Sequence, residues 1–428
     1  MSQRFRRSLG LFCFFILTVG CHELDRKSPS GQEISVRVIS KYDQSPFYAR
    51  IPTRYERVLV TSTSVGLSGT RLVIPQNQEL YFVEIHKPRS PALPHEIYRH
   101  DAIRLFTASD AREAYLISKH AGDDIHPINI ELRSLTYPIS YSQDQDLTDQ
   151  LLRKSTEELI QIDPTQLRLD LESISGARPI EVDGQSVTLA NRATTENKTT
   201  ARRWLEGELT SLGYTVTLHS YGTGVNLIAE KKSRSSLDED IIMITAHLDT
   251  VMTAGADDNG SGIATALSVA RALSKKDLRQ TIRIVAFDEE ERGLVGSAAY
   301  ARHLAKMGEI SKIRVINLEM TGYDSDDNGE FHAIDCNENM SNQLTQAVLS
   351  AISSVGLALR RVEACTNRSD HSSFWNYDRP AIVISQNFFG GDGNPCYHRS
   401  CDTTSKINFG YLTKLTQGVA NAVYQIAD

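Results

Sequence analysis

The sequence predicts an α/β fold, a mixed twisted sheet with helices on both faces, preceded by a small β-rich domain. Two observations support this prediction. From about residue 215 onward, apolar runs of strand length alternate with segments of helical periodicity, which is the pattern of a sheet with helices packed on both sides. Before that point, residues 33 to about 140 contain only short β-rich runs, separated by Pro and Gly.

The N-terminal segment has the features of a bacterial export signal. Three arginines lie within the first seven residues, and the apolar stretch at residues 9–19 is too short to span a membrane. The stretch ends in Leu-Thr-Val-Gly-Cys, which resembles a lipobox whose Cys21 becomes lipidated. We therefore expect a signal peptide with lipobox over residues 1–21, and an exported lipoprotein at the periplasmic face of the outer membrane. The alternative is cleavage near Gly20 and a periplasmic or secreted protein.

A polar linker at residues 22–32 leads into the β-rich domain, which we place at residues 33–145. Its predicted strands span residues 34–39, 58–61, 72–74, 80–85, 103–106 and 114–117. These short runs predict a small β-sandwich or a similar all-β domain, and none of them carries a motif for chemistry. The polar segment at residues 141–150 marks the boundary to a second domain, residues 146–428.

The second domain contains the alternating pattern. Helices are predicted at residues 147–162, 165–174, 199–212, 261–274, 294–307, 340–355 and 410–426. Strands are predicted at residues 215–219, 225–230, 241–246, 281–287, 313–318 and 381–385. The rhythm is that of a sheet whose strands are connected by helices.

Composition narrows the function classes. A net charge of -7 with 23% charged residues leaves no basic footprint for nucleic acid. Beyond the lipobox, four cysteines remain: Cys336, Cys365, Cys396 and Cys401. In an oxidising compartment they favour two disulfides, with three pairings open, over a structural zinc site, because no pair has the C-x-x-C spacing.

Side chains that bind metals gather after the predicted strands. They are His247, Asp249, Asp257 and Asp258 after the strand at 241–246, the acids 288–291 after the strand at 281–287, Glu319 after the strand at 313–318, and His398 in a late loop. Strand ends of an open α/β sheet form its sites, so we expect these groups to lie together. Imidazole with carboxylate suits zinc, or alternatively manganese or cobalt, whereas calcium takes oxygen ligands. A surplus carboxylate beside a ligand suits the general base of metal-assisted hydrolysis.

Four motifs carry a family resemblance: AHLDT, GADDNGSG, DEEERGLVGS and YHRSCDT. In order and spacing they resemble those of metallopeptidase family twenty-eight, which holds bacterial zinc aminopeptidases, glutamate carboxypeptidases and animal glutaminyl cyclases. The resemblance covers roughly residues 150–428. It implies a zinc exopeptidase-like fold and a zinc metallopeptidase with two Zn²⁺ ions per chain.

The resemblance also implies roles for single residues. It makes His247, Asp257, Glu291, Glu319 and His398 the metal ligands, with Asp257 bridging the two ions. Glu319 stands where the family usually has an Asp. Glu290 would be the general base, and Asp249 would complete the catalytic group by orienting His247. Asp402 would orient His398, and a cis peptide is implied between Asp257 and Asp258.

The resemblance therefore leads us to expect an aminopeptidase that removes the N-terminal residue of peptides. Candidates for the side-chain pocket are Met320, Tyr323, Phe374, Tyr397 and the pair Phe388–Phe389. A carboxypeptidase stays open because Arg292, Arg368, Arg379 and Arg399 lie near the motifs and a C-terminal carboxylate needs such residues. A one-zinc glutaminyl cyclase is a second alternative, and a non-catalytic binding module is a third from outside the enzymes. The partner expected is a peptide substrate; the oligomeric state is left open.

Overall fold

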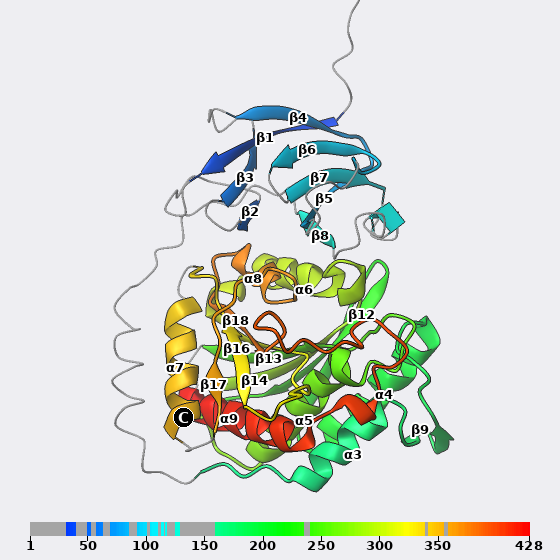
Figure 1. Cartoon of the computed structure of the whole chain (residues 1–428), viewed down its shortest axis with the longest axis vertical. Coiled ribbons are helices and arrows are strands. Elements are labelled where there is room, and N and C mark those ends of the chain that lie inside the picture. The colour runs from blue at the N-terminus through cyan, green and yellow to red at the C-terminus, as the bar shows by residue number, and fades with distance from the viewer. Residues whose placement is uncertain are drawn as a thin grey trace, which may run out of the picture.

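The computed structural model describes two separate sets of elements, which Figure 1 shows as a β-rich unit and a larger α/β unit. It describes residues 31–39, 49–52, 57–62, 69–84, 92–100, 103–109, 113–114, 116–117, 125–128, 159–234, 240–338, 341–354 and 358–428. The expected signal peptide, lipobox and most of the linker therefore lie outside the described residues. So do the boundary at 145 and most of the helix predicted at 147–162, whose last described residues are not helical.

The β-rich unit consists of two four-stranded sheets. The first, in the order β2-β3-β1-β4, comprises Ala49–Pro52, Arg57–Ser62, Gly31–Ile39 and Thr70–Pro75. The second, in the order β6-β7-β5-β8, comprises Glu96–His100, Ile103–Ala108, Glu79–Glu84 and Ile125–Ile128. Side chains from both sheets, such as Ile34 and Leu105, share one buried cluster, so the sheets pack face to face. The β-rich prediction is confirmed, and β2, β6 and β8 are additions to it.

The strand predicted at 114–117 is wrong, because its described residues are helical. Ala114 and Ile117, three residues apart, are buried against the second sheet, whereas Leu116 is exposed. Burial at a spacing of three is helical periodicity, and a four-residue window was too short to distinguish it from a strand.

The α/β unit is built on an eight-stranded mixed sheet. Its order is β11-β12-β14-β13-β15-β18-β16-β17. In that order the strands are Thr215–Tyr221, Gly224–Lys231, Thr281–Phe287, Ile241–His247, Ile313–Glu319, Ala381–Gln386, Glu330–Ile334 and Arg360–Arg361. The four central strands run parallel, and β12 and β16 pair with them antiparallel. The last two strands in this order, β16 and β17, were not predicted.

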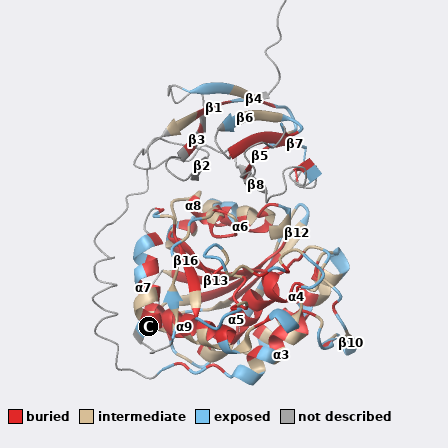
Figure 2. Cartoon of the chain, viewed as in Figure 1, coloured by how far each residue is buried: buried red, intermediate tan, exposed pale blue. Residues whose placement is uncertain are grey.

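Helices cover both faces of this sheet, as predicted. They are α3 (Pro164–Ile174), α4 (Thr195–Ser211), α5 (Gly262–Leu273), α6 (Val295–Met307), α7 (Ser341–Ser354), α8 (Ser372–Trp375) and α9 (Phe409–Ala427). Alternate residues of β13 point to opposite faces: Ile242 and Ile244 join the cluster with α3, α4, α5, α7 and α9, whereas Met243 joins the one with α6 and α8. Figure 2 shows the strands buried between these helices. Among the described residues, no helix is long and apolar enough to cross a membrane.

Two disulfides are present, which confirms the expectation for the four cysteines. They join Cys336 to Cys365 and Cys396 to Cys401. The small hairpin of β9 (Ile180–Val182) and β10 (Gln185–Val187) completes the unit. The fold thus brings the carboxyl ends of β13, β14 and β15 to one edge, where the site is formed.

Candidate metal centre

The strand ends deliver the metal-binding side chains to one place. His247 is the last residue of β13 and Glu319 the last residue of β15, and these two strands pair in parallel. Glu290 and Glu291 follow β14, which lies on the other side of β13. His398 comes from the loop closed by the disulfide between Cys396 and Cys401. The prediction that these distant segments meet at one sheet edge agrees with the structure.

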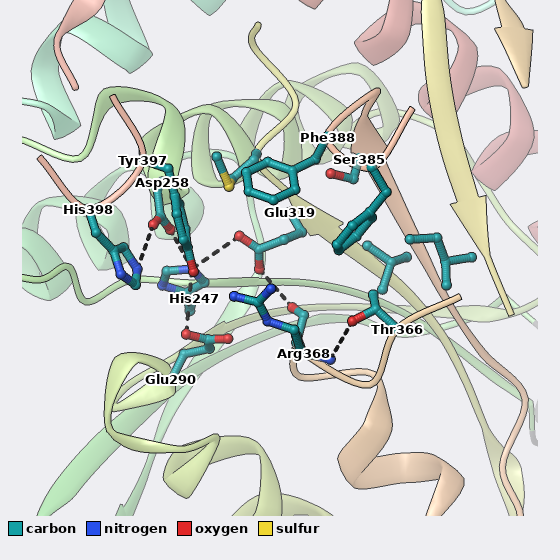
Figure 3. A pocket seen from close by; sticks show the side chains of 15 residues that line it. His247, Asp258, Glu290, Glu319, Thr366, Arg368, Ser385, Phe388, Tyr397 and His398 are labelled. Carbon is teal, nitrogen blue, oxygen red and sulfur yellow. Dashed lines mark hydrogen bonds and ion pairs between the residues drawn. The ribbon is translucent and has the colours of Figure 1, made fainter. Parts of the chain in front are cut away.

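Two sets of ligand atoms share one carboxylate, that of Asp258 (Figure 3). In the first set, Nε2 of His247 lies 3.2 Å from Oδ1 of Asp258 and 3.4 Å from Oε1 of Glu319. In the second set, Nε2 of His398 lies 3.2 Å from Oδ2 of Asp258 and 2.9 Å from Oε2 of Glu291. The ligand atoms of His247, Asp258 and Glu291 all lie within 4.8 Å of one another. The shared carboxylate has the position of a bridge between two metal ions.

The predicted bridging residue, Asp257, is therefore wrong by one position. Its Oδ1 accepts a hydrogen bond from the backbone N of Gly322 and its Oδ2 accepts one from Asn394, so its carboxylate is used inside the protein. The cis peptide is likewise displaced by one residue, to Asp258–Asn259. In the sequence the two aspartates are neighbours with the same chemistry, and no signal in it distinguishes them.

The reason for this orientation is the side chain of Asp402. Its two carboxylate oxygens accept hydrogen bonds from the backbone N–H groups of Asp257 and Asp258, at 3.0 and 3.1 Å. Asp402 thus holds the loop that presents the bridging carboxylate. It was predicted to orient His398, and that role has no support among the contacts of the described residues.

Asp249 has a double role. Nδ1 of His247 lies 3.0 Å from its backbone carbonyl and 3.6 Å from its Oδ1, so Asp249 orients His247 as predicted. The same carboxylate also accepts hydrogen bonds from the backbone N–H groups of Glu290 and Glu291, at 3.0 and 3.2 Å. One buried residue therefore positions a ligand of the first set through its backbone carbonyl, and a ligand of the second set and the candidate base through its carboxylate.

The protonation of the two neighbouring aspartates differs. Burial raises the pKa of Asp257 to about 7, and the charge of Asp402 adds to this rise. Burial also acts to raise the pKa of Asp258, but hydrogen bonds from His247 and His398 hold it below its usual range. Asp258 is thus the one of the pair that stays an anion near neutral pH, which is the form that binds a metal.

The donor set fits zinc. Two imidazoles and the carboxylates of Asp258, Glu291 and Glu319 converge in a largely buried place, and ionised groups there repel one another unless cations neutralise them. Imidazole nitrogen together with carboxylate oxygen is the ligand chemistry of zinc rather than of calcium. Glu319, longer by one methylene than the expected Asp, reaches the first set. Its Oε2 is held by a 2.7 Å hydrogen bond from Ser369.

Glu290 stands beside the two sets as the surplus carboxylate. Its Oε2 lies 4.0 Å from Nε2 of His247, and it lines the same pocket as His247, Asp258 and Glu319. Burial raises its pKa well above the usual range against the opposing charge of His247, and Glu319 adds to the rise. A carboxylate with a raised pKa beside a metal centre is suited to accept and return a proton.

A pocket opens from this centre, and apolar side chains make up much of its lining. The lining residues outside the ligand sets are Met320, Ile334, Thr366, Arg368, Ser369, Val383, Ser385, Phe388, Phe389 and Tyr397. Of the predicted pocket residues, Met320, Phe388, Phe389 and Tyr397 are therefore in place. Phe374 is wrong, because it is fully buried in the core, 6.2 Å from the ring of Phe287. Tyr323 does not belong to the described lining of this pocket either.

Arg192 is a residue of the site that the sequence did not suggest. Its fully buried guanidinium donates to the backbone carbonyls of Leu248, Ala254 and Gly255, which belong to the loop between His247 and Asp258, and also to that of Ile174. Burial lowers its pKa to about 10, so it stays charged at neutral pH. It braces the loop that places both ligands.

Comparison with known proteins agrees with this geometry. Residues 226–423 match the model of Peptidase family M28. Aminopeptidase YwaD of Bacillus subtilis (strain 168) is 32% identical over 211 residues, which are 47% of this chain and 45% of that protein. The chain spans about half the length of the curated relatives it matches.

Two solved structures share the fold. Legionella pneumophila LapA aminopeptidase matches with a TM-score of 0.62 at 18% identity, over 82% of this chain and 99% of that chain. Residues 159–428 alone cannot supply that share, so the likeness extends into the β-rich unit. Bacteroides thetaiotaomicron glutaminyl cyclase matches with a TM-score of 0.53 at 20% identity, over 62% of this chain and 99% of that chain. The stretch that matches the family model, residues 226–423, contains every ligand of the two sets.

Proposed function

We propose that the protein is a two-zinc aminopeptidase that hydrolyses the N-terminal peptide bond of peptides. The observation that carries the proposal is the pair of ligand sets sharing Asp258, with Glu290 beside them at the inner end of a pocket. The similarity to Aminopeptidase YwaD supports the same class of reaction.

His247, Asp258 and Glu319 would hold one zinc ion, and His398, Asp258 and Glu291 the other. When bound, two zinc ions supply Lewis acidity, which polarises the scissile carbonyl and lowers the pKa of the attacking water. Asp249 forms hydrogen bonds with both His247 and the backbone N–H of Glu290. It therefore fixes the position of the base relative to the ligand sets.

Glu290 moves the proton of the reaction. It accepts a proton from the water whose oxygen forms a bond to the carbonyl carbon, while the carbonyl π electrons move to the carbonyl oxygen. When the tetrahedral intermediate collapses, the C–N bond breaks and Glu290 returns that proton to the leaving amine. Its raised pKa makes both transfers accessible near neutral pH.

The charges that line the pocket favour the amino end of a substrate. The carboxylates of Asp258, Glu290 and Glu319 line it, and in the described lining Arg368 is the single Lys or Arg. A carboxypeptidase would need a cluster of arginines for the C-terminal carboxylate. Of the four arginines near the motifs, Arg292 pairs with Glu289 and Arg379 donates to Ile313, away from the pocket.

Hydrolysis of three substrates tests the proposal: a free-N-terminal leucyl anilide, its N-acetylated twin, and an N-blocked dipeptide with C-terminal glutamate. Zinc content is measured on the same samples, for wild type, Glu290→Gln and Glu290→Asp. We expect cleavage of the free-amine substrate alone, about two zinc ions per chain, and a loss of kcat in Glu290→Gln of roughly 10²-fold or more, partly restored in Glu290→Asp.

Each of the other outcomes would assign the protein to a different functional class. Cleavage of the blocked dipeptide moves it to the carboxypeptidases. A fourth substrate, a peptide that begins with glutamine, tests the cyclase alternative: its cyclisation with about one zinc ion per chain makes the protein a glutaminyl cyclase. Two zinc ions without any hydrolysis would leave a metal-binding module.

We also propose that the protein is exported and anchored through a lipid on Cys21. The support is the basic segment, the apolar stretch and the lipobox-like end described above. Mass spectrometry of the mature N-terminal peptide tests this: a diacylated Cys21 is expected, and its loss in Cys21→Ser. An unmodified N-terminus at another residue would contradict the anchor.

A further inference from the structure

The loop before α8 places one arginine at the edge of the metal centre. The backbone N of Arg368 donates to Oγ1 of Thr366 at 3.1 Å, and the next residue, Ser369, donates to Oε2 of Glu319 at 2.7 Å. Cys365 is tied to Cys336 at the end of β16. The loop is thus fixed on both sides of Arg368, which limits where its side chain can reach.

Figure 3 shows the guanidinium of Arg368 pointing into the pocket, toward the side on which His247 and Glu319 lie. The opposite side of the centre is occupied by His398. Apolar side chains such as Ile334 and Val383 belong to the lining of the same pocket. The guanidinium therefore places a cation in a pocket that also offers apolar surface to a substrate.

We propose that Arg368 is a catalytic residue that donates hydrogen bonds to the scissile carbonyl oxygen as this oxygen becomes an anion. The inference rests on the proposed hydrolase function. During attack by water, the carbonyl π electrons move to that oxygen, and Glu290 holds the transferred proton. Arg368 stays protonated throughout, since a guanidinium keeps its charge at neutral pH. Its N–H groups act as fixed donors for the developing charge.

The position of Arg368 argues for this role rather than for selection of acidic side chains. A residue that selects a side chain would lie away from the metal ligands. Arg368 instead adjoins Glu319 through Ser369. A donor aimed at an oxyanion is worth roughly 10²–10³-fold in kcat, and the gain does not depend on the substrate side chain.

The first experiment compares wild type, Arg368→Met, Arg368→Lys and Arg368→Ala on anilides of leucine, glutamate and lysine. We expect Arg368→Met to lower kcat by roughly 10²-fold for all three substrates, with KM changed by less than about threefold and zinc content unchanged. Arg368→Lys should recover part of the loss, and added guanidinium should partly rescue Arg368→Ala. The matched control is Arg360→Met, an exposed arginine of the preceding strand that pairs with Glu330, and it should behave as wild type.

Calorimetric binding provides a readout without turnover. The probes are the phosphonic acid analogue of leucine, which is tetrahedral and anionic, and leucinol, which lacks the anion. Arg368→Met should weaken the phosphonate by roughly 10-fold or more relative to leucinol. If wild type hydrolyses none of the anilides, the proposed function fails, while this binding ratio still decides the role of Arg368.

Four results would overturn the inference. A loss confined to the glutamyl anilide would make Arg368 a selector of acidic side chains. A loss of zinc would make it a support for Glu319. Equal weakening of both probes, or unchanged kcat, would leave it no part in stabilising the oxyanion.

Discussion

Oδ2 of Asp258 lies 3.2 Å from Nε2 of His398, while the other oxygen of the same carboxylate lies 3.2 Å from Nε2 of His247. A single side chain therefore belongs to both ligand sets. The adjacent Asp257 has the same chemistry but points to Gly322 and Asn394. Of these two neighbouring residues, Asp258 is therefore the candidate metal ligand, whereas Asp257 stabilises the surrounding loops through hydrogen bonds.

The pair Asp258→Asn and Asp257→Asn tests the assignment. Asp258→Asn removes the shared anion, so we expect it to bind less than about one zinc ion per chain and to lose nearly all activity. Asp257→Asn is the matched control and should keep about two zinc ions, at a stability cost of roughly 1–3 kcal/mol from its disturbed buried hydrogen bonds. Metal analysis measures the zinc content of both variants, and thermal unfolding measures their stability. Loss of zinc in Asp257→Asn alone would show that Asp257, and not Asp258, is the shared ligand.

Zinc binding should release protons near neutral pH. Burial acts to lower the pKa of His398, but the carboxylates of Glu291 and Asp258 raise it to about 11. Burial likewise acts to lower the pKa of His247, and Glu319 with Glu290 raise it well above its usual range. Both imidazoles are therefore protonated in the metal-free protein at pH 7, and zinc must displace these protons.

With up to two protons displaced, zinc affinity should rise up to roughly 100-fold per pH unit around neutrality and fall as the pH is lowered. Calorimetry in buffers of different ionisation enthalpy counts the protons released. An affinity independent of pH between 6 and 8 would show that the two imidazoles are already neutral in the metal-free protein.

The disulfide between Cys396 and Cys401 should matter for metal binding. It closes a segment with a sequence separation of 5 that contains His398, whose backbone has a φ of 56°. We expect Cys396→Ser/Cys401→Ser to bind the zinc of the His398 set roughly 10–100-fold more weakly. The control is Cys336→Ser/Cys365→Ser, a disulfide of separation 29, which should mainly lose about 3 kcal/mol of stability. Zinc titrations of both variants under non-reducing conditions distinguish the two effects.

Arg192 should be essential for stability. Replacement by Met would leave the carbonyls of Leu248, Ala254 and Gly255 without their donor in a buried place, at a cost of roughly 3–5 kcal/mol. Arg203, whose ion pair with Asp183 is exposed, is the control, and Arg203→Met should cost less than about 1 kcal/mol. Chemical denaturation of both variants measures the difference. Equal costs would mean that the buried hydrogen bonds of Arg192 add nothing beyond a surface ion pair.

The sequence by itself determined the α/β architecture and the kind of site. Runs such as 241–246 and 281–287 became strands with nearly the expected limits, because a short continuous apolar run is typical of a strand that is buried on both faces. Histidines and acids placed after parallel strands had to converge, since the carboxyl ends of such strands meet at one edge. That argument needs the residue types and the strand positions, and both are visible in the sequence.

Only the tertiary structure decided which side chain of each loop faces the centre. Asp258 is the bridge because Asp402, at a sequence distance of 145 from Asp257, accepts hydrogen bonds from both backbone amides of the aspartate pair. Phe374 entered the core, and Arg192 reached the loop after β13 from 56 residues away. Direction within a loop is set by such long-range hydrogen bonds and by packing, which leave no periodic pattern in the chain, whereas the position of a strand end is set by local burial.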